Sequence, residues 1–261
     1  MSEIPQEKVD DANKEILKYS LLAMSSSLVP GKEFDPLVDS ALQYKMIVEL
    51  EDIYEVKNGI TIQKFVSVII DNFAWKVVGS KITGLTKYLP PPFNTAAALQ
   101  MAWDFVTTFA IGHAFRKVFE HAHKNNIEPN MSNIADLVLE SVIEGKEYFI
   151  RNFTTILGMS KITLEKLDID IDKVVADGKK IFDSQDELTK EFHEIIAATN
   201  KAVHDLGSTQ ADFDKTLDEL AKKIDTPSIE MLEAELNIRE LNGEDVGDLR
   251  TFLNNLKNIA S

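Results

Sequence analysis

Two apolar runs lie between residues 20 and 54 and are separated by the helix breakers Pro30 and Gly31. Apolar residues recur every three or four positions in both runs, and this spacing continues through almost the whole chain. Alternating runs bounded by turn residues are scarce, so the pattern predicts amphipathic helices with few strands. We therefore expect an all-α fold, built as a multi-helix bundle.

Proline and capping residues indicate where several of these helices begin. Asp35 before Pro36 and Thr226 before Pro227 place a capping oxygen next to a residue that suits the first helical position. Residues 60–70 are rich in β-branched side chains and could form a strand, but no hairpin partner follows, so we predict a helix. The predicted helices span residues 6–28, 36–56, 61–82, 94–124, 131–150, 163–182, 186–206, 209–224, 227–241 and 245–259.

The composition excludes several classes of protein. The 261 residues are 44% hydrophobic, which is enough for a substantial core. A net charge of −15 argues against a phosphate-binding surface, so we expect no nucleic-acid partner. The chain has no cysteine, which excludes disulfides and thiolate metal sites. The first 15 residues are polar and acidic and lack the basic-then-apolar order of a secretory signal. We therefore expect a cytoplasmic protein, and a location peripheral to the inner face of the membrane stays open.

Charge is distributed unevenly along the chain. Residues 161–261 hold 13 basic and 23 acidic side chains, whereas residues 1–160 hold 15 basic and 20 acidic ones. Near residue 160 the pattern changes from long apolar runs to short acidic helices. This change predicts two domains, an apolar helical bundle over 1–160 and a smaller acidic helical region over 161–261.

The middle of the chain is apolar and locally basic. The hydrophobic segments 65–82 and 93–115 flank a run of three prolines and predict a central apolar helical hairpin. Each segment approaches the ~20 residues that span a bilayer. However, Asp71 and Lys76 interrupt the first segment, and Asp104 interrupts the second. Inserting one charged side chain at the centre of a bilayer costs about 2.5–3.5 kcal/mol. The sequence therefore disfavours spontaneous spanning.

Two interpretations of this hairpin stay open. It is either buried in the bundle or in contact with an anionic membrane surface. Both tryptophans of the chain lie here among lysines, a mixture typical of the lipid headgroup boundary. The predicted membrane- or partner-contact residues are Trp75, Lys76, Lys81, Lys87 and Trp103.

No sequence motif predicts catalysis, a metal or a cofactor. Residues 79–86 have the glycine spacing of a phosphate-binding loop, but Leu85 stands where the lysine is needed. Glu120 and His123 have the spacing of a metal-binding pair, yet the second such pair of a di-iron bundle is missing. We therefore predict no catalytic residue, no metal and no cofactor.

Three polar residues in the apolar middle form a candidate buried polar site. They are Asp71, Asp104 and His113. Burying such groups without a partner is costly, so they would need hydrogen bonds or a role in binding.

Residues 18–123 resemble the helical domain of unknown function that follows the GTPase domain in bacterial membrane-associated GTPases of the YcjF type. The first block of similar residues is Ala23, Leu28, Pro30, Gly31, Asp35, Leu42, Gln43, Met46, Ile47 and Tyr54. The second block is Thr107, Thr108, Ala110, Gly112, Phe119 and Glu120. The resemblance implies a helical module that is membrane-associated or a GTPase partner, with no catalytic residues to carry over.

The leading hypothesis is a non-enzymatic helical interaction module. It would act at an anionic membrane surface or as the partner of a GTPase or another protein, and it would be able to oligomerise. Two alternatives stay open. One is a small-molecule-binding protein or enzyme with a pocket in the bundle, and the other is a pore-forming or oligomeric structural protein.

Overall fold

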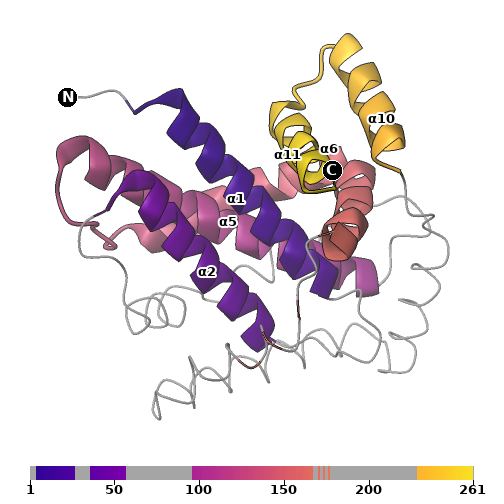
Figure 1. Ribbon diagram of the computed structural model, residues 1–261. Helices are drawn as coiled ribbons and strands as arrows, with labels where there is room; N and C mark the ends of the chain where they lie inside the picture. The colour runs from indigo at the N-terminus through magenta and orange to yellow at the C-terminus, as the bar shows by residue number, and fades with distance from the viewer. Residues whose placement is uncertain are drawn as a thin grey trace.

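The computed structural model describes residues 4–26, 36–56, 96–166 and 228–260, and the isolated positions 170, 173 and 176. These ranges contain helices and no strand, which confirms the all-α class (Figure 1). The predicted helical segments between residues 57 and 95 and between 177 and 227 lie outside them. The six helices are α1 (Gln6–Ser26), α2 (Pro36–Tyr54), α5 (Ala96–Asn125), α6 (Ile134–Lys166), α10 (Ile229–Leu241) and α11 (Gly247–Ala260).

Helix α1 occupies the centre of this arrangement. Every residue from Tyr19 to Ser25 is buried, and seven consecutive positions point in all directions around a helix. Other parts of the protein must therefore surround this half of α1. The helix as a whole contacts α2, α5, α6 and α11. Figure 1 shows α1 crossing the middle of the molecule.

Side-chain pairs define the direction of the helices around α1. Lys8 Nζ donates a hydrogen bond to the carbonyl oxygen of Ile53 at 2.8 Å, and Tyr19 Oη donates one to Glu49 at 2.6 Å. Because the early part of α1 meets the late part of α2, the two helices are antiparallel.

Helices α2 and α5 run in the same direction. Gln43 Nε2 donates to Thr108 Oγ1 at 3.2 Å, and further along both helices Tyr54 Oη donates to Glu120 Oε1 at 2.9 Å. Parallel neighbours cannot be joined by a tight turn, and the long segment between residues 57 and 95 connects them.

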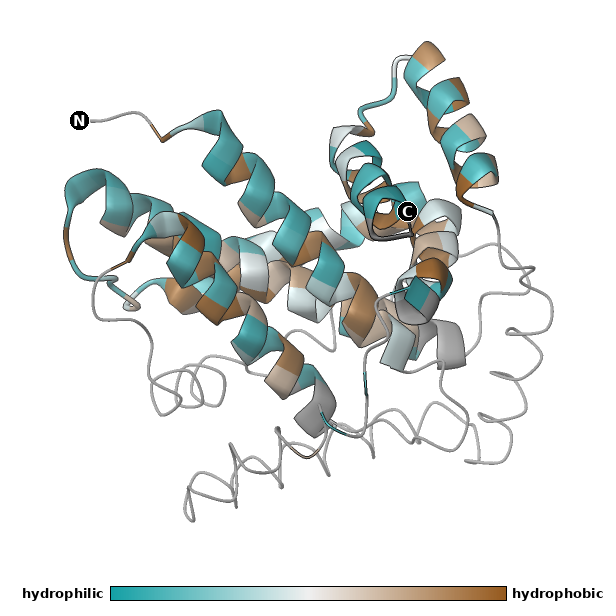
Figure 2. Ribbon diagram, viewed as in Figure 1, coloured by the Kyte–Doolittle hydropathy of each residue, from teal (hydrophilic) through white to brown (hydrophobic). Residues whose placement is uncertain are grey.

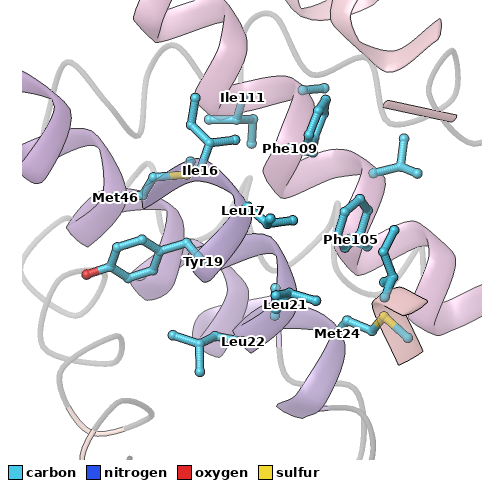
Figure 3. Close-up of a cluster of buried hydrophobic side chains, with 14 of the residues drawn as sticks. Ile16, Leu17, Tyr19, Leu21, Leu22, Met24, Met46, Phe105, Phe109 and Ile111 are labelled. Carbon is cyan, nitrogen blue, oxygen red and sulfur yellow. The ribbon is translucent and has the colours of Figure 1, made fainter. Parts of the chain in front are cut away.

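Helices α1, α2 and α5 approach one another most closely at Gly112. A Cβ atom on this glycine would lie 2.7 Å from Ile16 Cγ1 and 2.9 Å from Met46 Sδ. Both side chains are fully buried and lie next to each other in the core (Figure 3). The absence of a side chain at Gly112 therefore lets the three helices pack at this distance.

An aromatic layer joins α5 to α6. Phe105 and Phe149 have ring centroids 5.3 Å apart, and Phe109 stacks on Tyr148 at 5.1 Å. Such offset and tilted pairs add to the free energy gained from burial, by about 0.5–1.5 kcal/mol each.

Helix α6 is longer than the sequence predicted. The predicted end at residue 150 is wrong, because the helix continues to Lys166 and Thr163, expected to start a new helix, is buried inside it. Phe153, Ile156 and Leu157 continue the buried apolar stripe, and no proline interrupts the turn.

The predicted domain boundary at residue 160 consequently falls inside α6. Helices α10 and α11, from the predicted acidic domain, contact α6, and α11 also contacts α1. The division into two domains stays a prediction.

The other described helices agree with the predicted ranges to within a few residues. Pro36 begins α2, as expected. For α10 the cap is Ser228, whose hydroxyl accepts a hydrogen bond from the backbone N–H of Met231, and the helix begins two residues later than predicted.

Three helices end in the same hydrogen-bonded turn, the Schellman motif. After α10 it contains Gly243, whose φ of +79° suits glycine. After α2 and α5 the equivalent positions are Glu55 and Asn126, both with φ of +51°. Glu55 therefore adopts a backbone conformation that disfavours most side chains.

Candidate functional site

Of the five residues predicted to contact a membrane or partner, the structure describes one. Trp75, Lys76, Lys81 and Lys87 lie outside them. Trp103, on α5, is half-buried and packs against the hydrophobic core. No described helix has both the length and the apolar character needed to cross a membrane. Membrane contact through this set stays a prediction.

The structure separates the two described members of the candidate buried polar site, whose third member, Asp71, lies outside the described ranges. Asp104 is 1% exposed and accepts a hydrogen bond from Gln100 Nε2 at 2.7 Å. His113 follows nine positions later on α5, which corresponds to about 13.5 Å along the axis and half a turn around it. Asp104 and His113 therefore cannot act on one ligand.

His113 lies against an aromatic ring. Its imidazole is 4.2 Å from the ring of Phe109, measured between centroids. Burial, with smaller effects of Arg116 and Lys117, lowers the pKa of His113 to about 3. The imidazole is neutral at physiological pH and takes part in the aromatic packing of α5.

Glu120 and His123 both contact Tyr54. Glu120 accepts the hydrogen bond from the Tyr54 hydroxyl, and His123 Nδ1 donates to the Tyr54 carbonyl oxygen at 2.5 Å. Arg116 Nε lies 3.3 Å from Glu120 Oε1. These contacts place the Glu-x-x-His spacing in the α2–α5 interface, and no group of three or more metal-ligating side chains occurs in the ranges that the structure describes.

A small pocket lies beside these residues, at the ends of α2 and α5. Its volume is about 180 Å³, which is below the ~300–1,000 Å³ of typical ligand sites. Its lining consists of Glu55, Val56, Ala122, His123, Asn126 and Ile127.

An acidic cluster that sequence reasoning missed links α1 to α2. Glu49 accepts hydrogen bonds from Tyr19 Oη at 2.6 Å and from Lys18 Nζ at 3.0 Å, and Lys18 also pairs with Glu15. The residues come from two helices and follow no motif, so no sequence signal predicts their proximity.

The pKa values of the two carboxyl groups in this cluster shift in opposite directions. Burial and a hydrogen bond to Glu49 raise the pKa of Glu15 to about 7. Burial opposes the ionisation of Glu49, but hydrogen bonds from Glu15, Tyr19 and Lys18 together lower its pKa to about 2. Glu15 therefore resists ionisation, whereas Glu49 is held in its ionised form.

Helix α10 is held on α6 by Arg239. Its Nη1 donates to Thr155 Oγ1 at 3.1 Å, and its Nη2 donates to Asn152 Oδ1 at 2.6 Å. Its Nε donates to Glu244 at 2.7 Å, in the turn after α10. The planar guanidinium thus links α10 to α6 through two acceptors and to the turn after α10 through a third.

The opposite side of α10 carries exposed apolar residues. Met231 is 64% exposed, Ile238 59% and Leu241 88%. Together with the exposed Ala234 they follow helical spacing along one face, which we name the outer stripe. Leu232 and Leu236, on the other face, are buried against the bundle. Figure 2 shows hydrophobic residues recurring along α10 up to its C-terminal end.

Comparisons with protein-family models, with curated proteins and with solved structures find no match to this chain. The resemblance to the GTPase-associated domain therefore stays a prediction.

The two blocks that carry this resemblance nevertheless contact each other. Gln43 pairs with Thr108, Met46 lies over Gly112, and Tyr54 pairs with Glu120. Each pair joins one residue of the first block to one of the second. These six residues of the resemblance thus lie in the α2–α5 interface, which gives them a structural role.

Proposed function

We propose that this protein is a non-enzymatic helical interaction module that binds a protein partner through the outer stripe of α10. The observation that supports the proposal is the two-sided apolar character of this helix. One apolar face packs on the bundle, and the other exposes Met231, Ile238 and Leu241 in a row. Scattered apolar residues are common on surfaces, whereas a continuous row on one helix is typical of a binding face.

Burial of the stripe supplies a driving force for association. Complete burial of one large aliphatic side chain contributes about 1.5–3 kcal/mol. The three large side chains of the stripe begin more than half exposed, so a partner would remove most of their surface from water. Part of that gain offsets the entropy lost on association.

Several hydrogen bonds and ion pairs hold the helix that carries the stripe. Arg239 fixes α10 on α6. Arg250, on α11, binds Glu240 through two hydrogen bonds of 2.8 and 3.2 Å, and Lys257 pairs with Glu233. A surface held in this way needs little reordering when a partner binds.

The resemblance of residues 18–123 favours a GTPase as the partner. Contact with an anionic membrane through Trp75, Trp103 and the nearby lysines is a separate part of the earlier hypothesis. It needs its own test, flotation of the purified chain with anionic vesicles at low and high salt.

Site-specific photocrosslinking in cells that express the protein tests the proposal. A photoreactive phenylalanine derivative replaces Ile238 in the stripe or, as a matched control, Asn254 on the exposed side of α11. We expect a discrete crosslinked protein from position 238 and none from position 254. The crosslinked protein is then purified and titrated onto the native chain and onto the double variant Ile238→Ser, Leu241→Ser.

Loss of binding in the double variant, with unchanged thermal unfolding, would support the proposal. Equal crosslinking from both positions, or equal binding by the double variant, would contradict it. A GTP-binding domain in the crosslinked protein would support the identification of the partner class.

A further inference from the structure

We propose that the outer stripe binds an amphipathic helix whose apolar face is bordered by lysine or arginine. This inference rests on the proposed function and specifies the chemistry of the partner. It follows from the charges around the stripe and from the length of the stripe.

Helix α10 carries acidic side chains and almost no basic ones. Its charged residues are Glu230, Glu233, Glu235, Glu240 and Arg239. Arg239 faces α6 and is occupied by three acceptors, so it contributes no free cation to the outer side. Glu230 is fully exposed, next to the stripe on the helical surface, and its hydrogen bond with Ser228 lowers its pKa, which keeps it ionised.

The neighbouring helix α11 neutralises only part of this charge, through the pairs of Arg250 with Glu240 and of Lys257 with Glu233. Residues 228–260 contain seven acidic and three basic side chains, a net charge of −4. All three basic residues already pair with acidic ones, Arg239 with Glu244, Arg250 with Glu240, and Lys257 with Glu233. The stripe therefore lies beside the exposed, ionised Glu230 in a segment of net charge −4, and this acidic surround would attract basic side chains at the edges of a partner.

The length of the stripe matches one helix of the partner. Met231 to Leu241 covers about 15 Å along the axis, or nearly three turns. Apolar residues spaced by three and four positions on both helices pack as a seam. A contact of this size is at the low end of known interfaces, so we expect weak binding, with a Kd of about 1–100 μM.

Two other occupants fit the charges less well. A second copy of this chain would bring two acidic surrounds together, and like charges across an interface oppose association. An anionic lipid surface would be repelled in the same way. Both are outcomes that the experiment distinguishes.

The test uses the full chain and three synthetic helical peptides of 14 residues, each labelled with a fluorophore. The first has a leucine face bordered by lysine, the second replaces each lysine by glutamate, and the third scrambles the first. Binding is measured by fluorescence anisotropy at low and high salt. We expect the lysine peptide to bind at least about tenfold more tightly than either of the others.

Variants of the chain assign the binding to the stripe. Ile238→Ser with Leu241→Ser should weaken binding of the lysine peptide by about tenfold or more, and Glu230→Lys by about threefold with a smaller salt dependence. The matched control is Leu139→Ser with Ile143→Ser, which alters another exposed apolar pair, on α6, and should leave binding unchanged. Thermal unfolding confirms that each variant is folded.

Equal affinity for the glutamate or scrambled peptide, or full binding by the stripe variant, would overturn the inference. Crosslinking from position 238 could still succeed in that case, so the proposed function would stand without this partner chemistry. Two further results would also overturn it. Stripe-dependent dimerisation in sedimentation would favour a second copy, and stripe-dependent flotation with anionic vesicles would favour lipid.

Discussion

The substitution Gly112→Ala tests the central packing of the structure. The new methyl group would lie 2.7 Å from Ile16 Cγ1, 2.9 Å from Met46 Sδ and 3.0 Å from Ile16 Cγ2. Carbon atoms in favourable contact are about 3.5–4.0 Å apart. Ile16 would therefore have to move by roughly 0.5–1 Å, although it is fully buried and lies on the central helix α1.

Two opposing effects determine the magnitude. Alanine is favoured over glycine inside a helix by about 1 kcal/mol, which alone would stabilise the protein. Overpacking of a dense core costs about 1–3 kcal/mol. Because two atoms of a β-branched side chain and one sulfur lie at or within 3.0 Å, we place the cost at the upper end. We expect a net loss of about 1–2 kcal/mol in the free energy of unfolding.

Urea unfolding followed by circular dichroism measures this change. The matched control is Gly247→Ala at the start of α11, where the nearest atom to the new methyl group is Asp245 Oδ1 at 3.5 Å. The control has no such clash, so we expect no loss of stability.

A second variant separates the clash from other effects. Ile16→Ala removes Cγ1 and Cγ2 and should cost about 2–5 kcal/mol by itself. In the double variant with Gly112→Ala, the loss should be at least about 1 kcal/mol smaller than the sum of the two single losses. Greater stability of Gly112→Ala than of the native chain, or simple additivity, would refute the close approach of α1, α2 and α5.

Three other predictions concern the helix ends and the polar clusters. Glu55→Gly removes the strain of a positive φ and should raise the free energy of unfolding by up to about 1 kcal/mol. Gly243→Ala should lower it by a similar amount in the same urea experiment. A loss of stability in Glu55→Gly would contradict the turn geometry. Glu15 has a folded pKa raised to about 7, so its contribution to stability is full below pH 4.5 and is lost as the pH rises through 7. As the pH rises from 5 to 8, the free energy of unfolding of Glu15→Gln should therefore increase relative to that of the native chain. Parallel pH profiles of the two proteins would contradict the raised pKa of Glu15. Arg239→Ala should lower the free energy of unfolding by about 2–3 kcal/mol because it leaves part-buried acceptors unpaired. Arg239→Lys should not restore this stability, since one ammonium group cannot reach all three acceptors. Hydrogen exchange in α10 measures the local effect, and unchanged exchange in both variants would contradict this role of Arg239.

The candidate sites show where sequence reasoning fails. Asp104 and His113 stand out as polar residues in an apolar segment, but helical geometry places them on opposite sides of α5. Glu15 and Glu49 are ordinary in the sequence, and their opposite pKa shifts arise because α1 and α2 pack antiparallel. Proximity between helices depends on tertiary packing, which local spacing does not encode.

The outer stripe has a sequence signal that could have been recognised. Apolar residues on α10 cover two opposite faces, with Leu232 and Leu236 on one and Met231, Ile238 and Leu241 on the other. The sequence cannot say which face packs inward. In the structure Leu232 and Leu236 pack inward, and Arg239 binds its two acceptors on α6 from the same side of the helix.

The sequence by itself determined the helical class and most helix boundaries. Apolar spacing and proline act within a few residues, so they can be recognised without knowing the neighbours. The continuation of α6 past residue 150, the contact of Ile16 and Met46 with Gly112, and the exposure of the outer stripe were decided by the tertiary structure. Each depends on which surfaces of different helices bury one another, and that choice is made by the packing of the whole bundle.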